Sequence, residues 1–189
     1  MGERLSFQAG YALVLDEIHG ALCAVDRAQV EALLDALQAA DKVFFVGVGR
    51  VMLSLQAIAK RLNHLGIEAH CVGDINEPAI TDRDILIVAS GSGESVIPVA
   101  IARIAHRHGA TIVHIGSNPH SSLAAITRLF VRIPVQTKLG LPGEMPSRQV
   151  MSSLFEQTLY ILGDTVALML VDRRQLVIKD LWAFHANLE

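Results

Sequence analysis

Residues 84–109 read DILIVASGSGESVIPVAIARIAHRHG, and this stretch decides the fold. A short aliphatic run is followed at once by small polar residues, and these lead into a segment with helical spacing that ends at Gly109. A brief aliphatic run bounded by turn residues is typical of a central strand in a parallel sheet. Glycine commonly ends a helix in the left-handed conformation. The stretch therefore predicts a strand, a tight polar loop and a helix.

The same pattern recurs along the chain. Four further runs read as strands: KVFFVG at 42–47, EAHCVG at 68–73, TIVHIGS at 111–117 and LFVRIPV at 129–135. The segment between the first two, VMLSLQAIAKRLNHLG, has helical spacing and ends at Gly66. Alternating strands and helices imply parallel pairing with right-handed crossovers. We expect an α/β protein with a doubly wound, five-stranded parallel sheet of flavodoxin-like order and helices on both faces.

The segments outside this alternation are helical in pattern. The 189 residues are most simply one domain, 1–189. Two helices are expected within 1–40, a long buried helix over 149–170, and a polar helical tail over 175–188. We expect segments 1–40 and 174–189 to pack on the sheet domain or on a neighbouring subunit. The Gly- and Pro-rich segment 135–149 is the one long loop and is expected to be the most mobile element.

Composition excludes several classes of protein. Hydrophobic residues make up 51% of the chain and aromatic residues only 5%, which predicts an aliphatic core. A net charge of −3 argues against a nucleic-acid binder. There is no signal-peptide pattern, and the longest apolar run is interrupted by Gly163 and Asp164, so we expect no membrane span. Cys23 and Cys71 lack metal-type spacing and are expected to be free thiols in a reducing cytoplasm. The histidines show no ligand spacing with acids, so no metal is predicted.

Three of the expected strands end in small polar residues or glycine, at GVGR (47–50), SGSGES (90–95) and GSNPHSS (116–122). Ligands of such sheets bind at the carboxyl ends of the strands, near the topological switch point. We call residues 90–95 the serine loop. It combines a helix N-terminus with permissive Gly91 and Gly93 and with the hydroxyls of Ser90, Ser92 and Ser95, which together favour phosphate. The alternative is an ordinary helix cap with turn glycines.

The first loop narrows the ligand class. It reads G-V-G-R-V-M, so the third glycine of the dinucleotide fingerprint is absent, and no Walker lysine follows either loop. A small phosphate ester is therefore favoured over a nucleotide. Gly47, Gly49 and Arg50 are expected to belong to the same binding site as the serine loop.

A polar stripe marks the last long helix. At about 100° per residue, five polar positions fall within roughly an 80° sector: Gln149, Ser153, Glu156, Tyr160 and Asp164. On a helix otherwise apolar all round, such a stripe indicates a site, and Glu156 is the candidate general base. The alternative is a narrow wet stripe, or acids hydrogen-bonded at a subunit contact, and for Asp164 we prefer that alternative.

His64 lies opposite the apolar side of its expected helix, beside Lys60 and Arg61. A histidine there can contribute to a site only by reaching a neighbouring subunit's cleft. Any function of His64 therefore requires an oligomer.

The serine loop followed by IGSNPHSSLA resembles the sugar isomerase (SIS) domain family, and SSLFEQTLYILGD with the terminal HANLE is similar to its 6-phospho-3-hexuloisomerase branch. The resemblance implies a cytoplasmic, cofactor-free isomerase, usually a homotetramer. Such enzymes interconvert D-arabino-3-hexulose 6-phosphate and fructose 6-phosphate through an enediol, in the ribulose monophosphate pathway of formaldehyde fixation.

Carried over by motif, the three serines of the loop hold phosphate and Glu156 is the base. The resemblance offers His64 and His185 as candidates for ring opening or proton handling. The chain departs from the family at three positions: Val51 stands where serine is common, and Val150 and Ser152 stand where the family commonly has proline and glycine. Two alternatives follow: an isomerase of another sugar phosphate, or a sugar-phosphate-sensing module without turnover.

Overall fold

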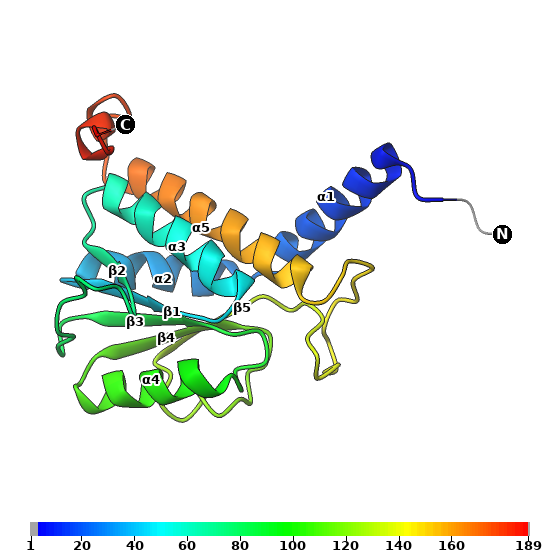
Figure 1. Cartoon of the computed structure of the whole chain (residues 1–189), viewed down its shortest axis with the longest axis horizontal. Coiled ribbons are helices and arrows are strands. Elements are labelled where there is room, and N and C mark those ends of the chain that lie inside the picture. Colours follow the sequence, from blue (N-terminus) through cyan, green and yellow to red (C-terminus); the bar gives the residue numbers. More distant parts are fainter. Residues whose placement is uncertain (1–3, 189) are drawn as a thin grey trace.

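The computed structural model describes residues 4–188. Its centre is a five-stranded parallel sheet in the order β2-β1-β3-β4-β5, which confirms the expected fold class (Figure 1). The strands are β1 (Val43–Val46), β2 (Ala69–Cys71), β3 (Ile85–Ala89), β4 (Thr111–Gly116) and β5 (Leu129–Arg132). In register, Val43 pairs with Ala69 on one side and with Ile85 on the other. The strand order reverses between β1 and β3, so the switch point lies between these two strands.

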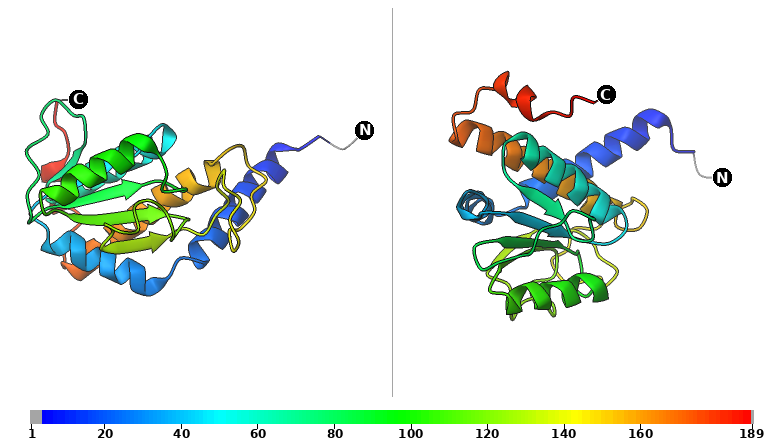
Figure 2. Two further views of the ribbon diagram at one scale, coloured as in Figure 1. Left: turned by 90° about the horizontal axis from the view of Figure 1, so that it is seen from below. Right: turned by 60° about the vertical axis from the view of Figure 1, so that its left-hand side comes forward.

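Helices cover both faces of the sheet, as Figures 1 and 2 show. Every residue of β1 and β3 is buried, which explains their unbroken apolar sequences. On one face lie α2 (Arg27–Ala39), α3 (Arg50–His64) and α5 (Ser153–Arg173), which share the larger hydrophobic core with the sheet. On the opposite face α4 (Val96–Arg107) forms a smaller core.

The N-terminal helix α1 (Phe7–Cys23) packs its C-terminal half against α5 and extends past the sheet (Figure 1). Ser6 caps it by accepting the Ala9 N–H at 3.2 Å. Phe7, Tyr11 and Leu15 are exposed on its projecting part. The two helices expected within 1–40 are therefore present; residues 1–3 and 189 of the expected flanking segments lie outside the described residues.

The long loop 135–149 is held by a carboxylate of α1. Glu17 of α1 accepts hydrogen bonds from Ser147 Oγ at 2.7 Å, the Arg148 N–H at 2.9 Å and Gln149 Nε2 at 3.0 Å. Burial alone would raise the pKa of Glu17, but these hydrogen bonds outweigh it and the pKa lies below its ordinary value. The loop that leads into α5 is thus anchored to α1.

The last long helix begins later than the sequence predicts. α5 begins at Ser153 rather than near residue 149, because Met151 adopts a left-handed φ of 55° and turns the chain just before it. Its length and hydropathy are those of a membrane-spanning helix, but 56% of its most apolar window is buried inside the protein. Such burial is what a core helix shows.

The predicted helical tail is wrong in its secondary structure. Within residues 174–188 the tail contains one regular element, the 3₁₀ turn η1 (Asp180–Phe184), and Gln175 takes a left-handed φ of 52° that reverses the chain. An isolated helix of this length is marginal in water. The tail instead packs back over the end of α3, where a Cβ on Gly66 would lie 3.4 Å from the Phe184 ring.

Candidate active site

The serine loop carries the chain from β3 into α4. Ser90 Oγ accepts the Gly93 N–H at 3.1 Å and lies 3.2 Å from Ser95 Oγ. Ser95 is the N-cap residue of α4, yet its side chain makes no capping hydrogen bond. An ordinary cap would place that hydroxyl on an N–H of the first helical turn. The serine loop therefore leaves the positive end of α4 without the side-chain cap that the alternative interpretation requires.

The loop after β4 is hydrogen-bonded to the serine loop. The N–H groups of Ser117 and Asn118 donate to the Gly91 carbonyl at 2.9 and 3.2 Å, and Asn118 Nδ2 donates to the Ser92 carbonyl at 3.1 Å. Ser122 donates through both N–H and Oγ to Glu94, and these bonds lower the pKa of Glu94. This supporting role was not apparent from sequence, because it joins side chains to backbone groups more than 20 residues away.

The glycine loop after β1 lies at the switch point beside the serine loop. A Cβ on Gly47 would lie 3.4 Å from the Ala89 carbonyl oxygen of β3. Gly49 has a φ of 58° and is the N-cap residue of α3. Arg50 is the first residue of α3, and its Nε donates to Glu156 Oε2 at 2.5 Å; its expected place in the phosphate site stays a prediction.

Glu156 is a buried carboxylate with two polar partners, and its backbone carbonyl has a third. It is 8% exposed, and besides Arg50 its side chain accepts the Ser152 hydroxyl at 3.0 Å, while its carbonyl accepts the Ser54 hydroxyl at 3.1 Å. The string Ser153-x-x-Glu156 has capping-box spacing, but the Glu156 side chain makes its hydrogen bonds to Arg50 and Ser152. A guanidinium and a hydroxyl thus both contact the carboxyl oxygens of Glu156.

A pocket of about 380 Å³ opens beside Glu156, between α1, α3 and α5. Arg50 and Glu156 supply its charged groups; its other lining residues include Val14, Leu53, Tyr160 and Ile161. The first turn of α5 also adjoins the serine loop, since a Cβ on Gly91 would lie 3.7 Å from the Phe155 ring. The predicted base and the predicted phosphate loop are therefore neighbours.

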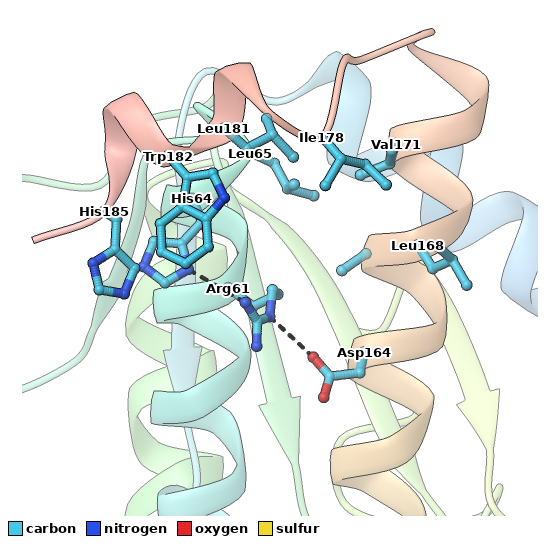
Figure 3. Close-up of a pocket in the computed structure, with 11 residues that line it drawn as sticks. Arg61, His64, Leu65, Asp164, Leu168, Val171, Ile178, Leu181, Trp182 and His185 are labelled. Carbon is cyan, nitrogen blue, oxygen red and sulfur yellow. Dashed lines mark hydrogen bonds and ion pairs between the residues drawn. The ribbon is translucent and has the colours of Figure 1, made fainter.

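The two candidate histidines lie together where the C-terminal tail meets the end of α3 (Figure 3). The rings of His64 and His185 stack with centroids 5.3 Å apart, and Trp182 flanks His185 at the same distance. Burial, and then the charges of Lys60, Arg61 and His185, lower the pKa of His64, which favours its neutral form. Fourteen residues of α3 separate Arg50 from His64, so Glu156 and His64 of one chain are about 20 Å apart.

A second pocket, also of about 380 Å³, lies under the tail beside these rings (Figure 3). On its rim Arg61 and Asp164 form an ion pair at 3.2 Å. This partnership fits the interpretation that Asp164 is a hydrogen-bonded acid of the stripe. Within residues 4–188, no three His, Cys, Asp or Glu side chains gather in a manner that would ligate a metal ion.

Comparison with known proteins identifies the family to which the chain belongs. No family model matches it. It is 39% identical over 178 residues to the 3-hexulose-6-phosphate isomerase of Mycobacterium gastri, covering 94% of this chain and 89% of that one. It is 33% identical over 178 residues to the enzyme of that name from Bacillus subtilis, covering 94% and 96%. A Methanococcus jannaschii structure, from which a molecular function of 3-hexulose-6-phosphate isomerase was inferred, superposes with a TM-score of 0.81 at 26% identity, covering 95% and 99%.

The sheet order, the serine loop at the switch point and these likenesses define a phosphosugar isomerase of the SIS fold. Within that class, both curated relatives carry the name 3-hexulose-6-phosphate isomerase. The chain belongs to the 3-hexulose-6-phosphate isomerase family, which is the 6-phospho-3-hexuloisomerase branch expected from its motifs.

Proposed function

We propose that this protein interconverts D-arabino-3-hexulose 6-phosphate and fructose 6-phosphate, in the cytoplasm and as a homotetramer. The observation that carries the proposal is the buried Glu156 carboxylate, held by Arg50 next to the serine loop. The names of the relatives support this substrate.

In this proposal the substrate phosphate binds at the N-terminus of α4. The N–H groups of its first turn and the hydroxyls of Ser90, Ser92 and Ser95 donate to the phosphate oxygens. Gly91 and Gly93 let the backbone approach the phosphate, and Gly47 and Gly49 form the adjoining wall. The phosphate is remote from the reacting carbons, so its binding energy orients them.

Proton transfer follows from the chemistry of the two ketoses. The Glu156 carboxylate removes the proton from C2 of the 3-ketose and the C2–C3 enediolate forms with its charge on O3. The hydroxyl proton then passes from O2 to O3, and Glu156 returns its proton to C3 as the carbonyl develops at C2. Arg50 stabilises the enediolate oxygen, because its guanidinium contacts the base and lines the same pocket. Arg50 thus serves the reacting carbons rather than the phosphate.

His64 and His185 fit this reaction only across a subunit boundary, since about 20 Å separates His64 from Glu156 in one chain. α3 and α5 run in the same direction, as the pairs Arg50–Glu156 and Arg61–Asp164 show. A twofold copy packed antiparallel along these helices brings the partner's His64 toward Glu156. Exposed Leu53 and Leu168 along the two helices supply an apolar surface for such packing.

Subunit mixing tests this arrangement. Glu156→Gln and His64→Asn chains are each expected to be inactive alone. Unfolded together and refolded, they form mixed dimers with one intact site of two, which restores about a quarter of wild-type activity at random pairing. Mixtures that stay inactive would show that the histidine does not act across subunits.

A substrate panel tests the function itself. Purified protein is assayed with D-arabino-3-hexulose 6-phosphate, fructose 6-phosphate formation being coupled to a dehydrogenase, and beside it with arabinose 5-phosphate. Turnover of the hexulose alone supports the proposal. Preference for the pentose would favour the other isomerase, and binding of either sugar phosphate without turnover would favour the sensing module.

A further inference from the structure

Beneath the serine loop lies a buried histidine for which the proposed mechanism has no use. His114 is on β4, is 1% exposed, and packs its ring against Phe130 of β5 with centroids 5.0 Å apart. Its Nε2 lies 3.0 Å from the Ser90 carbonyl oxygen. A carbonyl oxygen only accepts hydrogen bonds, so this contact requires the tautomer with hydrogen on Nε2. Burial lowers the pKa of His114, in keeping with a neutral ring.

The Ser90 carbonyl oxygen, which His114 contacts, also takes part in the turn of the serine loop. It accepts the Gly93 N–H at 3.1 Å, and the same N–H reaches Ser90 Oγ at 3.1 Å. A rotation of the Ser90 peptide would therefore displace the Ser90 hydroxyl and the turn through Gly93 together. Holding the Ser90 peptide in place therefore holds both the Ser90 hydroxyl and the turn through Gly93.

The backbone of two glycines, Gly93 and Gly116, packs closely against the His114 ring. A Cβ on Gly93 would lie 3.0 Å from His114 Cε1, and a Cβ on Gly116 would lie 2.4 Å from His114 Nε2 and 2.5 Å from the Ser90 carbonyl oxygen. The contacts at Gly116 are shorter than a real Cβ makes, so glycine is required there while the imidazole is in place, and the contact at Gly93 is tight. The loop is built around this side chain.

We propose that His114 is a positioning residue for the phosphate site, holding the Ser90–Gly93 turn through its Nε2–H. The inference rests on the proposed function in one respect, that this turn binds the substrate phosphate.

The test compares two substitutions of His114 with one of His70. A glutamine amide nitrogen can reach the Nε2 position, so His114→Gln keeps the donor, whereas His114→Met keeps the bulk and loses it. His70→Met is the matched control, since the His70 ring also packs on a phenylalanine of the sheet, Phe44, but bonds Glu68 rather than the loop. For each variant we measure KM, kcat, inhibition by inorganic phosphate, and Tm.

We expect His114→Met to raise KM and the phosphate inhibition constant about three- to tenfold with kcat little changed, as one lost hydrogen bond would. His114→Gln and His70→Met should stay near wild type. Equal constants in the Gln and Met variants, or an equal loss in His70→Met, would overturn the inference. Ser92→Ala separates the two claims: if it leaves phosphate inhibition unchanged, the phosphate site itself is misplaced.

A measurement on the wild-type enzyme covers the case in which His114→Met does not fold. The ring nitrogens of His114 can be assigned by NMR on ¹⁵N-histidine-labelled protein. The Nε2–H tautomer is the expected result. An Nδ1–H tautomer would contradict the hydrogen bond on which the inference depends.

Discussion

Gly93 offers the sharpest test of how the serine loop is built. It is buried with a φ of 66°, and a Cβ there would lie 2.3 Å from Ser121 Cβ and 2.4 Å from Ser121 Oγ. Gly93→Ala therefore combines a left-handed alanine, at about 1–2 kcal/mol, with overpacking, at about 1–3 kcal/mol. We predict a loss of about 2–5 kcal/mol in the free energy of unfolding.

Gly140 is the matched control, because it has a similar φ of 59° and no atom within 4 Å of its would-be Cβ. Gly140→Ala should lose only the conformational part, about 1–2 kcal/mol. Urea unfolding of both variants at equal protein concentration measures the difference. A Gly93→Ala protein as stable as Gly140→Ala would refute the packing argument. In the presence of Ser121→Gly, the additional cost of Gly93→Ala should shrink, since both closest atoms belong to Ser121.

Two further predictions concern buried groups away from the site. Asp84, whose side chain is wholly buried, pairs with Lys42 at 3.2 Å; burial alone would raise its pKa, but hydrogen bonds and Lys42 bring it below the ordinary 3.8. The stability that the ionised Asp84 confers is full above pH 3.8 and is lost as the pH falls through its native pKa. By urea unfolding at pH 7, Asp84→Asn should cost about 3–5 kcal/mol, whereas Asp41→Asn, at an exposed ion pair, should cost at most about 1 kcal/mol. Equal losses in the two variants would contradict this prediction. Burial raises the pKa of Cys71 to about 11, so a thiol reagent at pH 8 should modify Cys23 first and Cys71 only on unfolding; equal rates would contradict the burial of Cys71.

The fold was predictable because its signals are local. Each strand is a short aliphatic run, and the helices after β1 and β3 end in Gly66 and Gly109, which both have positive φ. The sequence predicts a polar helical tail over 175–188, but packing over the end of α3 selects a different conformation with a 3₁₀ turn at Asp180–Phe184. Local pattern cannot register such a tertiary contact.

The sequence indicates the residue types of the candidate site but not their pairings. The serines and glycines of the serine loop indicate phosphate binding by their residue types and spacing alone. The pairing of Arg50 with Glu156 joins residues 106 positions apart, and the anchoring of Gln149 by Glu17 joins residues 132 apart. These partners depend on how α1, α3 and α5 pack, so they emerge only with the structure.

The assignment of Glu156 as base is the central claim, and one comparison of variants tests it most directly. Glu156→Gln and Asp172→Asn, an exposed acid at the other end of the same helix, are assayed with D-arabino-3-hexulose 6-phosphate beside wild type. We predict that Glu156→Gln lowers kcat by about 10²–10⁴-fold with phosphate inhibition unchanged, as loss of a general base does, and that Asp172→Asn leaves both unchanged. A Glu156→Gln enzyme with wild-type kcat would contradict the account.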